Sequence, residues 1–191
     1  VSKYGFSLFS DLSRYVLAVI LALALQCILV YGGWTLAIAR IPFSRLWREV
    51  KTPFLYSIGV NSSLATLPLT LQALKKLNIS DRSATLGAGV ATNLNNDGIV
   101  LYEASAVFFV AAISNIDWSL WQMMLAALTC IVASMGITGV PEAGFISLTV
   151  VVSALGLPLE ALPLLLSVDW ILGRLRSGVN VLSDVTLSIA L

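Results

Sequence analysis

The chain has 191 residues, of which 58% are hydrophobic and 11% are charged. A soluble domain carries about 25% charged residues, and the mean hydropathy here is +0.93, so the composition indicates an all-α integral membrane protein. The net charge of +1 gives no reason to expect a nucleic-acid partner. Histidine, the usual general base and most common metal ligand, is absent from the sequence.

The first predicted element is a transmembrane helix in residues 1–40. Arg14 and Arg40 enclose 25 residues without a charge, and a bilayer core needs about 20 apolar residues. Seven basic residues follow this span, at Arg40, Arg45, Arg48, Lys51, Lys75, Lys76 and Arg82. The positive-inside rule places them on the cytoplasmic side, and it places the turn at 114–117, which has no basic residue, on the outer side.

Two later segments have a broken centre between apolar stretches. Residues 41–80 have a centre rich in Pro, Ser, Gly, Asn and Thr, and residues 115–160 contain SMGITGVPEAG. We expect two re-entrant helical hairpins, because irregular backbone at membrane depth must be buried in protein or line a cavity. Residues 81–114, between them, are a predicted transmembrane helix broken at NLNNDG. A proline kink in a longer helix is the alternative for any single break.

The break in residues 81–114 concentrates oxygen ligands. Its three asparagines and Asp97 lie in the middle of an apolar span. Amide, carboxylate and unwound carbonyl oxygens suit a hard cation such as sodium. A polar network that joins neighbouring helices is the alternative.

Residues 161–191 are predicted to form the last transmembrane helix. Asp169, Arg176, Asn180 and Asp184 recur at intervals of seven, four and four residues, which places them along one stripe of a helix. Such side chains are costly in lipid. We therefore expect the stripe to face protein or water.

With these elements in order, the chain resembles the core transport half of the glutamate transporter family, the dicarboxylate/amino acid:cation symporters. The similarity rests on four motifs in order: NSSLATLPLTL (Asn61 to Leu71), NNDGI (Asn95 to Ile99), GITGVPEAG (Gly136 to Gly144) and DWILGRLRSGVNVLSD (Asp169 to Asp184). The resemblance implies an elevator-type transport domain over residues 1–191. It also implies a homotrimer built through a scaffold domain that these residues lack.

The resemblance implies roles for individual residues. Arg176 would hold a substrate carboxylate, with further substrate contacts at Asn180, Ser63, Val140, Gly144 and Gly173. Cation ligands would be Asn95, Asp97, Asn180 and Asp184, and the backbone carbonyls of Ser134, Met135 and Ile137 would complete another cation site. Glu103 occupies the position of a proton-coupling glutamate, although a structural hydrogen bond is an equal alternative.

Several positions depart from the family pattern. Amino-acid carriers have an aspartate for the substrate ammonium where this chain has Gly173. The motif's methionine is Asn96, its threonine is Ile99, and the third serine of the first tip is Leu64. A buried ammonium without a partner is costly, so we expect C4-dicarboxylates. An acidic or neutral amino acid is the alternative, with Glu142 as a substitute partner.

The expected function is cation-coupled symport of a small anionic substrate, with sodium, protons or both as the coupled ions and without an organic cofactor. The expected location is the bilayer of a bacterial inner membrane. An intramembrane enzyme with Ser62 or Ser63 as nucleophile lacks a base, so we do not expect an enzyme. An anion-conducting channel is the alternative from another class.

Overall fold

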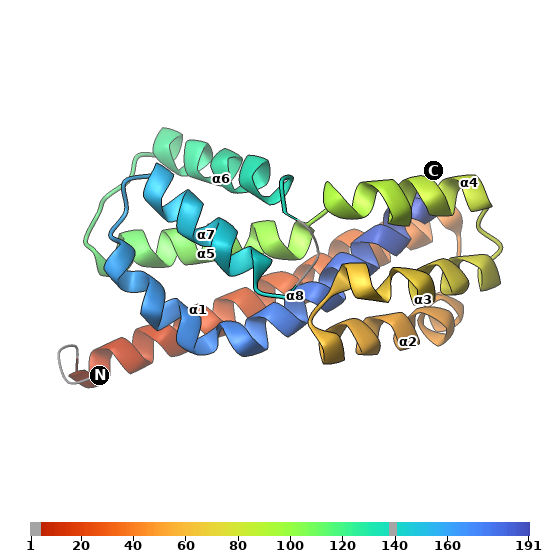
Figure 1. The fold of residues 1–191 in the computed structure, drawn as a ribbon, viewed down its shortest axis with the longest axis horizontal. Helices are drawn as coiled ribbons and strands as arrows, with labels where there is room; N and C mark the ends of the chain where they lie inside the picture. The colour runs from red at the N-terminus through yellow and green to blue at the C-terminus, as the bar shows by residue number, and fades with distance from the viewer. Residues whose placement is uncertain (1–4, 138–140) are drawn as a thin grey trace.

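The computed structural model describes residues 5–137 and 141–191, and all regular structure within these ranges is helical. The predicted all-α class is therefore confirmed for this part of the chain. Two long helices, α1 (Gly5–Leu25) and α8 (Leu162–Ala190), run along the length of an elongated molecule (Figure 1). The other helices form one group at each end.

The helix α1 continues without a break into two π-helical segments, η1 (Gln26–Gly32) and η2 (Thr35–Ala39). The helical run ends at Arg40, whose φ of 51° is left-handed. By length and composition, Ser10–Ile38 is the one helix among the described residues that qualifies as a membrane span.

The first hairpin consists of α2 (Phe43–Val60) and α3 (Ser63–Lys76). Pro53 and Pro68 lie inside these helices, so the break is narrower than the sequence suggests and comprises only Asn61 and Ser62. Asn61 adopts a left-handed φ of 53°, which asparagine tolerates better than most residues. The Ser62 hydroxyl caps α3 by accepting a hydrogen bond from the Ala65 N–H.

The next segment is interrupted, as its sequence predicts. The short helices α4 (Asp81–Ala84), η3 (Thr85–Val90) and η4 (Ala91–Asn93) precede an irregular turn at 94–96, and α5 (Asp97–Ile113) follows. The turn leaves backbone groups outside any helical ladder, where side chains can bind them.

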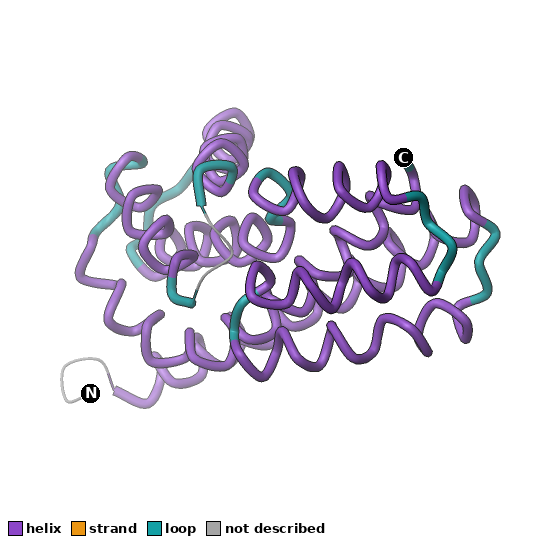
Figure 2. The backbone as a smooth tube through the Cα atoms, turned by 45° about the vertical axis from the view of Figure 1, so that its right-hand side comes forward, coloured by secondary structure: helices purple, strands orange, loops and turns teal. Residues whose placement is uncertain are grey.

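The second hairpin consists of α6 (Leu120–Ser134) and α7 (Ala143–Ala154), and η5 (Leu159–Ala161) leads into α8. A capping box between Ser119 and Gln122 begins α6. Both helices are apolar but too short to qualify as spans. The turn between α2 and α3 and the start of α7 lie near the middle of the molecule (Figures 1 and 2).

Two buried clusters hold the helices together. The larger one joins α1, α5, α6, α7 and the first half of α8, and the smaller one joins α2, α3, α4, η3 and the second half of α8. Because α8 belongs to both clusters, its central residues lie where the two helical groups meet.

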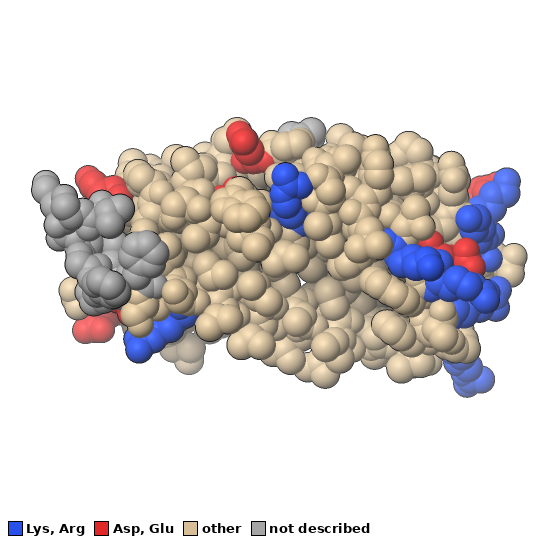
Figure 3. Space-filling view, turned by 90° about the horizontal axis from the view of Figure 1, so that it is seen from below, with Lys and Arg blue, Asp and Glu red and all other residues tan. Residues whose placement is uncertain are grey.

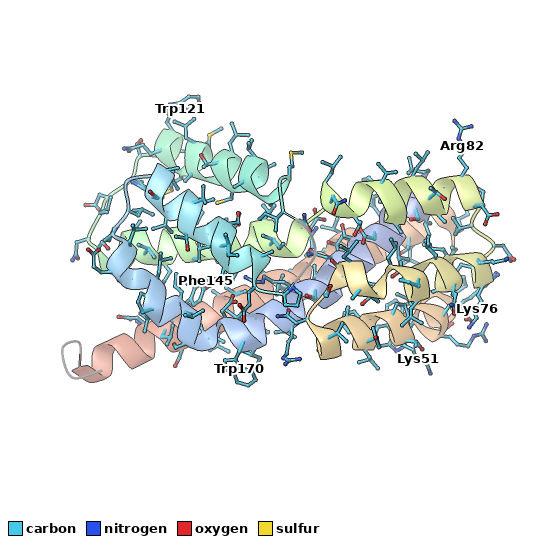
Figure 4. The ribbon with its side chains drawn as sticks, viewed as in Figure 1. Lys51, Lys76, Arg82, Trp121, Phe145 and Trp170 are labelled. Carbon is cyan, nitrogen blue, oxygen red and sulfur yellow. The ribbon has the colours of Figure 1, made fainter. Side chains whose placement is uncertain are left out.

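Charged residues are unevenly distributed over the surface. Lysine and arginine gather at one end, while most of the middle of the visible face is uncharged (Figure 3). Figure 4 shows Lys51, Lys76 and Arg82 at the end formed by α2, α3 and α4, whereas Trp121 and Trp170 project from the other half. This arrangement suits a molecule whose basic end lies at an anionic membrane surface.

Candidate substrate and cation site

The polar stripe of α8 faces the interior of the protein. Asp169, Arg176, Asn180 and Asp184 are only 2% to 5% exposed. They lie where α8 passes the turns of both hairpins and the break before α5. Four ionisable or amide side chains therefore share one buried region, as their spacing predicts.

The guanidinium of Arg176 is held by two side chains. It lies 3.8 Å above the ring centroid of Tyr102 on α5, and its Nη2 lies 3.0 Å from the Asp169 carboxylate Oδ1. This contact is a close ion pair without hydrogen-bond geometry, and Nη1 is buried without a hydrogen-bond partner among the described residues. Arg176 therefore retains hydrogen-bonding capacity for a carboxylate.

Glycines allow the hairpins to approach this guanidinium. A Cβ atom at Gly144 of α7 would lie 3.2 Å from the Arg176 Cζ, and one at Gly173 would lie 3.1 Å from Nη2. A larger side chain at either position would displace Arg176 or the chain that carries it.

A small cavity of about 20 Å³ lies beside Arg176. Its lining includes five predicted substrate residues and four others: Ser63, Gly144, Gly173, Arg176 and Asn180, together with Asn61, Ile99, Glu142 and Ser177. Val140, the remaining predicted substrate residue, lies outside the described residues. Segments of α2, α3, α5, α7 and α8 that are distant in sequence thus meet at one point.

Asn61 is a pocket residue that the sequence did not single out. Its Oδ1 lies 3.1 Å from the Ser177 hydroxyl, which donates to it, and 3.2 Å from the position of a Cβ atom at Gly173. The Nδ2 group has no hydrogen-bond acceptor among the described residues. Asn61 therefore fills the space beside Gly173 with a neutral amide.

Arg174 contacts the end of α2 instead of the cavity. Its Nη1 donates to the Ile58 carbonyl at 3.1 Å and to the Gly59 carbonyl at 2.6 Å. These carbonyls belong to the last turn of α2, where they lack helical partners. Arg174 therefore fixes the first hairpin turn against α8.

Asp97 lies in a second polar group, at the start of α5. Its Oδ2 accepts hydrogen bonds from Ser183 at 2.8 Å, Tyr31 at 2.9 Å and Gln26 at 3.2 Å. The sequence did not single out these three donors; Gln26 and Tyr31 belong to η1, and only tertiary packing brings them to Asp97. All three are neutral, so they do not compensate the carboxylate charge.

Asp184 lies next to this group on α8. Its Oδ2 accepts from Thr92 at 2.8 Å, and its Oδ1 accepts from Asn95 Nδ2 at 3.5 Å. Ser183 also contacts Asn95 Oδ1 at 2.9 Å, and Asn180 Oδ1 accepts the Gly98 N–H at 2.8 Å. The predicted ligands Asn95, Asp97, Asn180 and Asp184 are thus brought together.

The region therefore offers oxygens from carboxylates, amides and hydroxyls. Within the described residues, no cluster of three or more Asp, Glu, His or Cys side chains suits a metal ion. Two carboxylates with amide and hydroxyl neighbours fit a weakly held monovalent ion better than a tightly held structural metal.

The predicted ligands at the second hairpin contact an asparagine. Ser134 ends α6 and Met135 caps it, and the Met135 side chain is exposed. The carbonyls of Ser134 and Ile137 accept hydrogen bonds from Asn96 Nδ2 at 3.0 and 3.1 Å. The end of α6 is thereby linked to the break before α5.

Glu103 on α5 is fully buried, and neither carboxyl oxygen has a hydrogen-bond partner among the described residues. Cys130 of α6, Ser147 of α7 and Arg176 of α8 surround it. Ser147 is the neighbouring side chain able to donate a hydrogen bond to this carboxyl group, so the proton-coupling role and the structural role of Glu103 both stay predictions.

Comparison with known proteins identifies a matching family and several relatives. Residues 1–191 match the model of the sodium:dicarboxylate symporter family. The chain is 35% identical over 179 residues to excitatory amino acid transporter 3 of Oryctolagus cuniculus, covering 93% of this chain and 34% of that protein. It is 33% identical over 175 residues to excitatory amino acid transporter 1 of Ambystoma tigrinum, covering 91% and 32%.

Excitatory amino acid transporter 3 of Homo sapiens gives the same 35% identity, over 93% of this chain and 34% of the relative. The chain thus spans about a third of the length of the curated relatives it matches. Because the family match covers every residue and agrees with the four motifs, the chain belongs to the sodium:dicarboxylate symporter family.

Proposed function

We propose that the protein containing this chain is a cation-coupled symporter of small anionic substrates, most of all C4-dicarboxylates. The observation that carries this proposal is the Arg176 guanidinium, which is buried beside a small cavity. Its Nη1 has no hydrogen-bond partner among the described residues. A buried hydrogen-bond donor without a partner is costly. Binding of a carboxylate would remove that cost.

The wall of the cavity beside Gly173 favours a dicarboxylate over an amino acid. Position 173 has no side chain, and the Asn61 amide occupies the space into which one would project. An amide offers no negative charge to an ammonium group, whereas its Nδ2 can donate to a carboxylate or hydroxyl oxygen. Together with Arg176, it would contact a substrate whose polar groups are acceptors.

The charges of the site support coupling to cations. The Arg176 guanidinium is already paired with Asp169, and the hydrogen-bond donors to Asp97 and Asp184 are neutral. A dianion would add negative charge to a buried region in which the charge of these two carboxylates is not compensated. Sodium ions bound near Asn95, Asp97, Asn180 and Asp184 would restore neutrality, and protonation of Glu103 is a second route.

The cavity must widen to admit such a substrate. Its volume of about 20 Å³ is enough for about one water molecule. A four-carbon dianion needs several times this space, so the walls formed by α3, α7 and α8 have to separate.

We propose that the two helical hairpins are re-entrant and that residues 1–191 form the moving domain of an elevator-type trimer. The oligomeric mass of the solubilised complete gene product tests the trimer.

An amino-acid substrate is the second candidate. Glu142 lines the same cavity, and its carboxylate is the available partner for an ammonium group. The matched relatives are named as excitatory amino acid transporters, which also favours this candidate. The bacterial inner membrane remains a prediction, and the matched relatives come from animals.

Other classes of function have less support. The Ser62 hydroxyl caps α3 by accepting a hydrogen bond, and the Ser63 hydroxyl has no hydrogen-bond partner among the described residues. The sequence contains no histidine, the usual base for a serine nucleophile. The family and the matched relatives are transporters. An anion channel would give substrate-independent currents that do not saturate, which separates it from a symporter.

A binding titration of the complete gene product in lipid tests the proposal. Succinate and aspartate are each added with and without sodium. We expect saturable succinate binding only with sodium, and we expect Arg176→Ala to abolish it because the carboxylate loses its charged donor. Arg14→Ala, which removes an exposed arginine, is the matched control. Succinate binding that survives Arg176→Ala would overturn the assignment.

A further inference from the structure

Asn96 lies at the break before α5 and is 1% exposed. Its Nδ2 donates to three backbone carbonyls, those of Ser134 at 3.0 Å, Ile137 at 3.1 Å and Asn93 at 3.2 Å. Its Oδ1 accepts from Asn180 Nδ2 at 3.4 Å. A carbonyl oxygen only accepts hydrogen bonds, so three carbonyls around one atom require that atom to be the nitrogen.

This group of carbonyls has the character of a cation site. Ser134 ends α6, where carbonyls lack helical partners and the helix dipole is negative. Three carbonyl oxygens around one point would attract a hard cation. The family resemblance led us to expect a cation held by the carbonyls of Ser134, Met135 and Ile137. In the structure two of these carbonyls, those of Ser134 and Ile137, accept hydrogen bonds from the amide –NH₂ group of Asn96 instead.

We propose that the Asn96 amide replaces a cation at the end of α6. The partial positive charge of its two hydrogens satisfies the carbonyls of Ser134 and Ile137, so the second hairpin is fastened to the broken helix without a metal ion. An ion and the amide nitrogen cannot occupy the same position. The protein therefore takes up one sodium ion fewer than it would without this side chain.

This inference rests on the proposed cation-coupled function but concerns a different site. The group around Asp97 and Asp184 would still hold sodium, because the hydrogen-bond partners of its carboxylates among the described residues are neutral. Asn180 joins the two regions, since its Nδ2 contacts Asn96 and its Oδ1 accepts from Gly98. The amide thus links the end of α6 to the break before α5 at any sodium concentration, whereas a cation would link them only while it is bound.

Sodium-dependent unfolding of the complete gene product in lipid tests the inference without any substrate. Sodium ions that bind only the folded protein raise its free energy of unfolding, and this rise becomes steeper with sodium concentration when more ions bind. The midpoint of thermal unfolding is measured from low to high sodium at constant ionic strength. The slope of stability against the logarithm of sodium concentration then reports how many sodium ions bind.

We expect Asn96→Asp to raise this slope by about one sodium ion. The replacement keeps the shape of the side chain but puts an oxygen where the amide nitrogen was, so the carbonyls and the new carboxylate require a cation. Asn96→Ala, which removes the amide without adding charge, is expected to raise the slope in the same direction. Asn115→Asp adds the same charge at an exposed side chain in the turn between α5 and α6, away from the site, and is expected to leave the slope unchanged.

The inference is overturned if both Asn96 variants fold and keep the wild-type slope. A second series, with succinate and aspartate titrated at each sodium concentration, tests the proposed function separately. Failure of the wild-type protein to bind either compound would remove the proposed substrates but not the result for Asn96.

Discussion

At the scale of single residues, the proposed substrate pocket depends on glycines, which have no side chain, as much as on larger residues. Gly144 and Gly173 have no Cβ atom, and this allows the Arg176 guanidinium to lie against both hairpins. Asn61 then fills the free space beside Gly173 and hydrogen-bonds to Ser177. The polarity of the pocket is therefore set by an amide from a turn more than 100 residues earlier in the chain.

The amide of Asn61 should determine the preferred charge of the substrate. We expect Asn61→Asp to weaken succinate binding at least tenfold, because a carboxylate repels the dianion. The same change should strengthen aspartate binding, since it provides a partner for the ammonium group. Asparagine and aspartate both tolerate positive φ, so the turn should be preserved. Equilibrium binding to the complete gene product measures both effects.

Asn115 provides the matched control for this change. It also has a positive φ, of 52°, but it lies at an exposed turn between α5 and α6. Asn115→Asp should leave both affinities unchanged. An unchanged preference in Asn61→Asp would show that the amide does not contact the substrate.

Glu103 should determine the pH dependence of transport. Its buried carboxyl group has no hydrogen-bond partner among the described residues, and desolvation penalises the charged form. We expect Glu103→Gln to remove the pH dependence of uptake and to retain its sodium dependence. Uptake by vesicles over a range of external pH measures this. If uptake by Glu103→Gln depends on pH as the wild type does, Glu103 is not the proton carrier.

At the scale of the helices, α5 and η3 pack against α8 by close backbone contact. A Cβ atom at Gly98 would lie 2.7 Å from the Arg176 carbonyl oxygen, and one at Gly87 would lie 2.5 Å from the Ser188 Cα. The start of α5 and the segment η3 therefore depend on glycine to reach α8. Gly98 also donates its N–H to Asn180. The same residue therefore makes the close backbone contact with α8 and a hydrogen bond of the polar group.

We expect Gly98→Ala to lower the free energy of unfolding by about 1–3 kcal/mol, the usual cost of overpacking. It should also weaken sodium binding, because the start of α5 moves away from Asn180. Thermal unfolding with and without sodium measures both effects.

Gly59 is the matched control for Gly98, because it lies in α2 with no atom within 4 Å of its Cβ position. Gly59→Ala should be neutral or stabilise the protein by up to about 1 kcal/mol through helix propensity. Equal stability losses at the two positions would contradict the close-packing argument.

At the scale of the whole molecule, the basic residues and the turn at 114–117 lie at opposite ends. Lys51, Lys76 and Arg82 lie at the end formed by α2, α3 and α4 (Figure 4), while the turn joins α5 to α6 in the other group of helices (Figure 1). The buried site lies between these ends. A substrate entering from either side of a membrane would thus meet a hairpin before it reached Arg176.

The orientation can be tested with single cysteines in intact cells. Asn115→Cys should react with a membrane-impermeant maleimide from outside, whereas Lys75→Cys should react only after permeabilisation, by the positive-inside rule. Both positions are exposed. The native Cys27 and Cys130 are partly or fully buried, and the unsubstituted protein measures their background. The reverse labelling pattern would contradict the proposed orientation.

Much of the fold was predictable from the sequence because its signals are local. The charge-free stretch before Arg40, the breaks near Asn61 and Asn96, and the periodicity of α8 depend on residues that are neighbours along the chain or along one helix. The exact extent of the first break was less predictable. Pro53 and Pro68 suggested a wider interruption, but both are accommodated within helices.

The sequence by itself determined the helical class, the family and the polar stripe of α8, since hydropathy, periodicity and motif order are properties of the linear chain. Only the tertiary structure decided which groups contact that stripe. Tyr102 comes from α5, Asn61 from the turn after α2 and Tyr31 from η1. The residues next to them in the sequence do not indicate how close they lie to Arg176 or Asp97. Such contacts depend on how whole helices pack, so they exist only once the chain has folded.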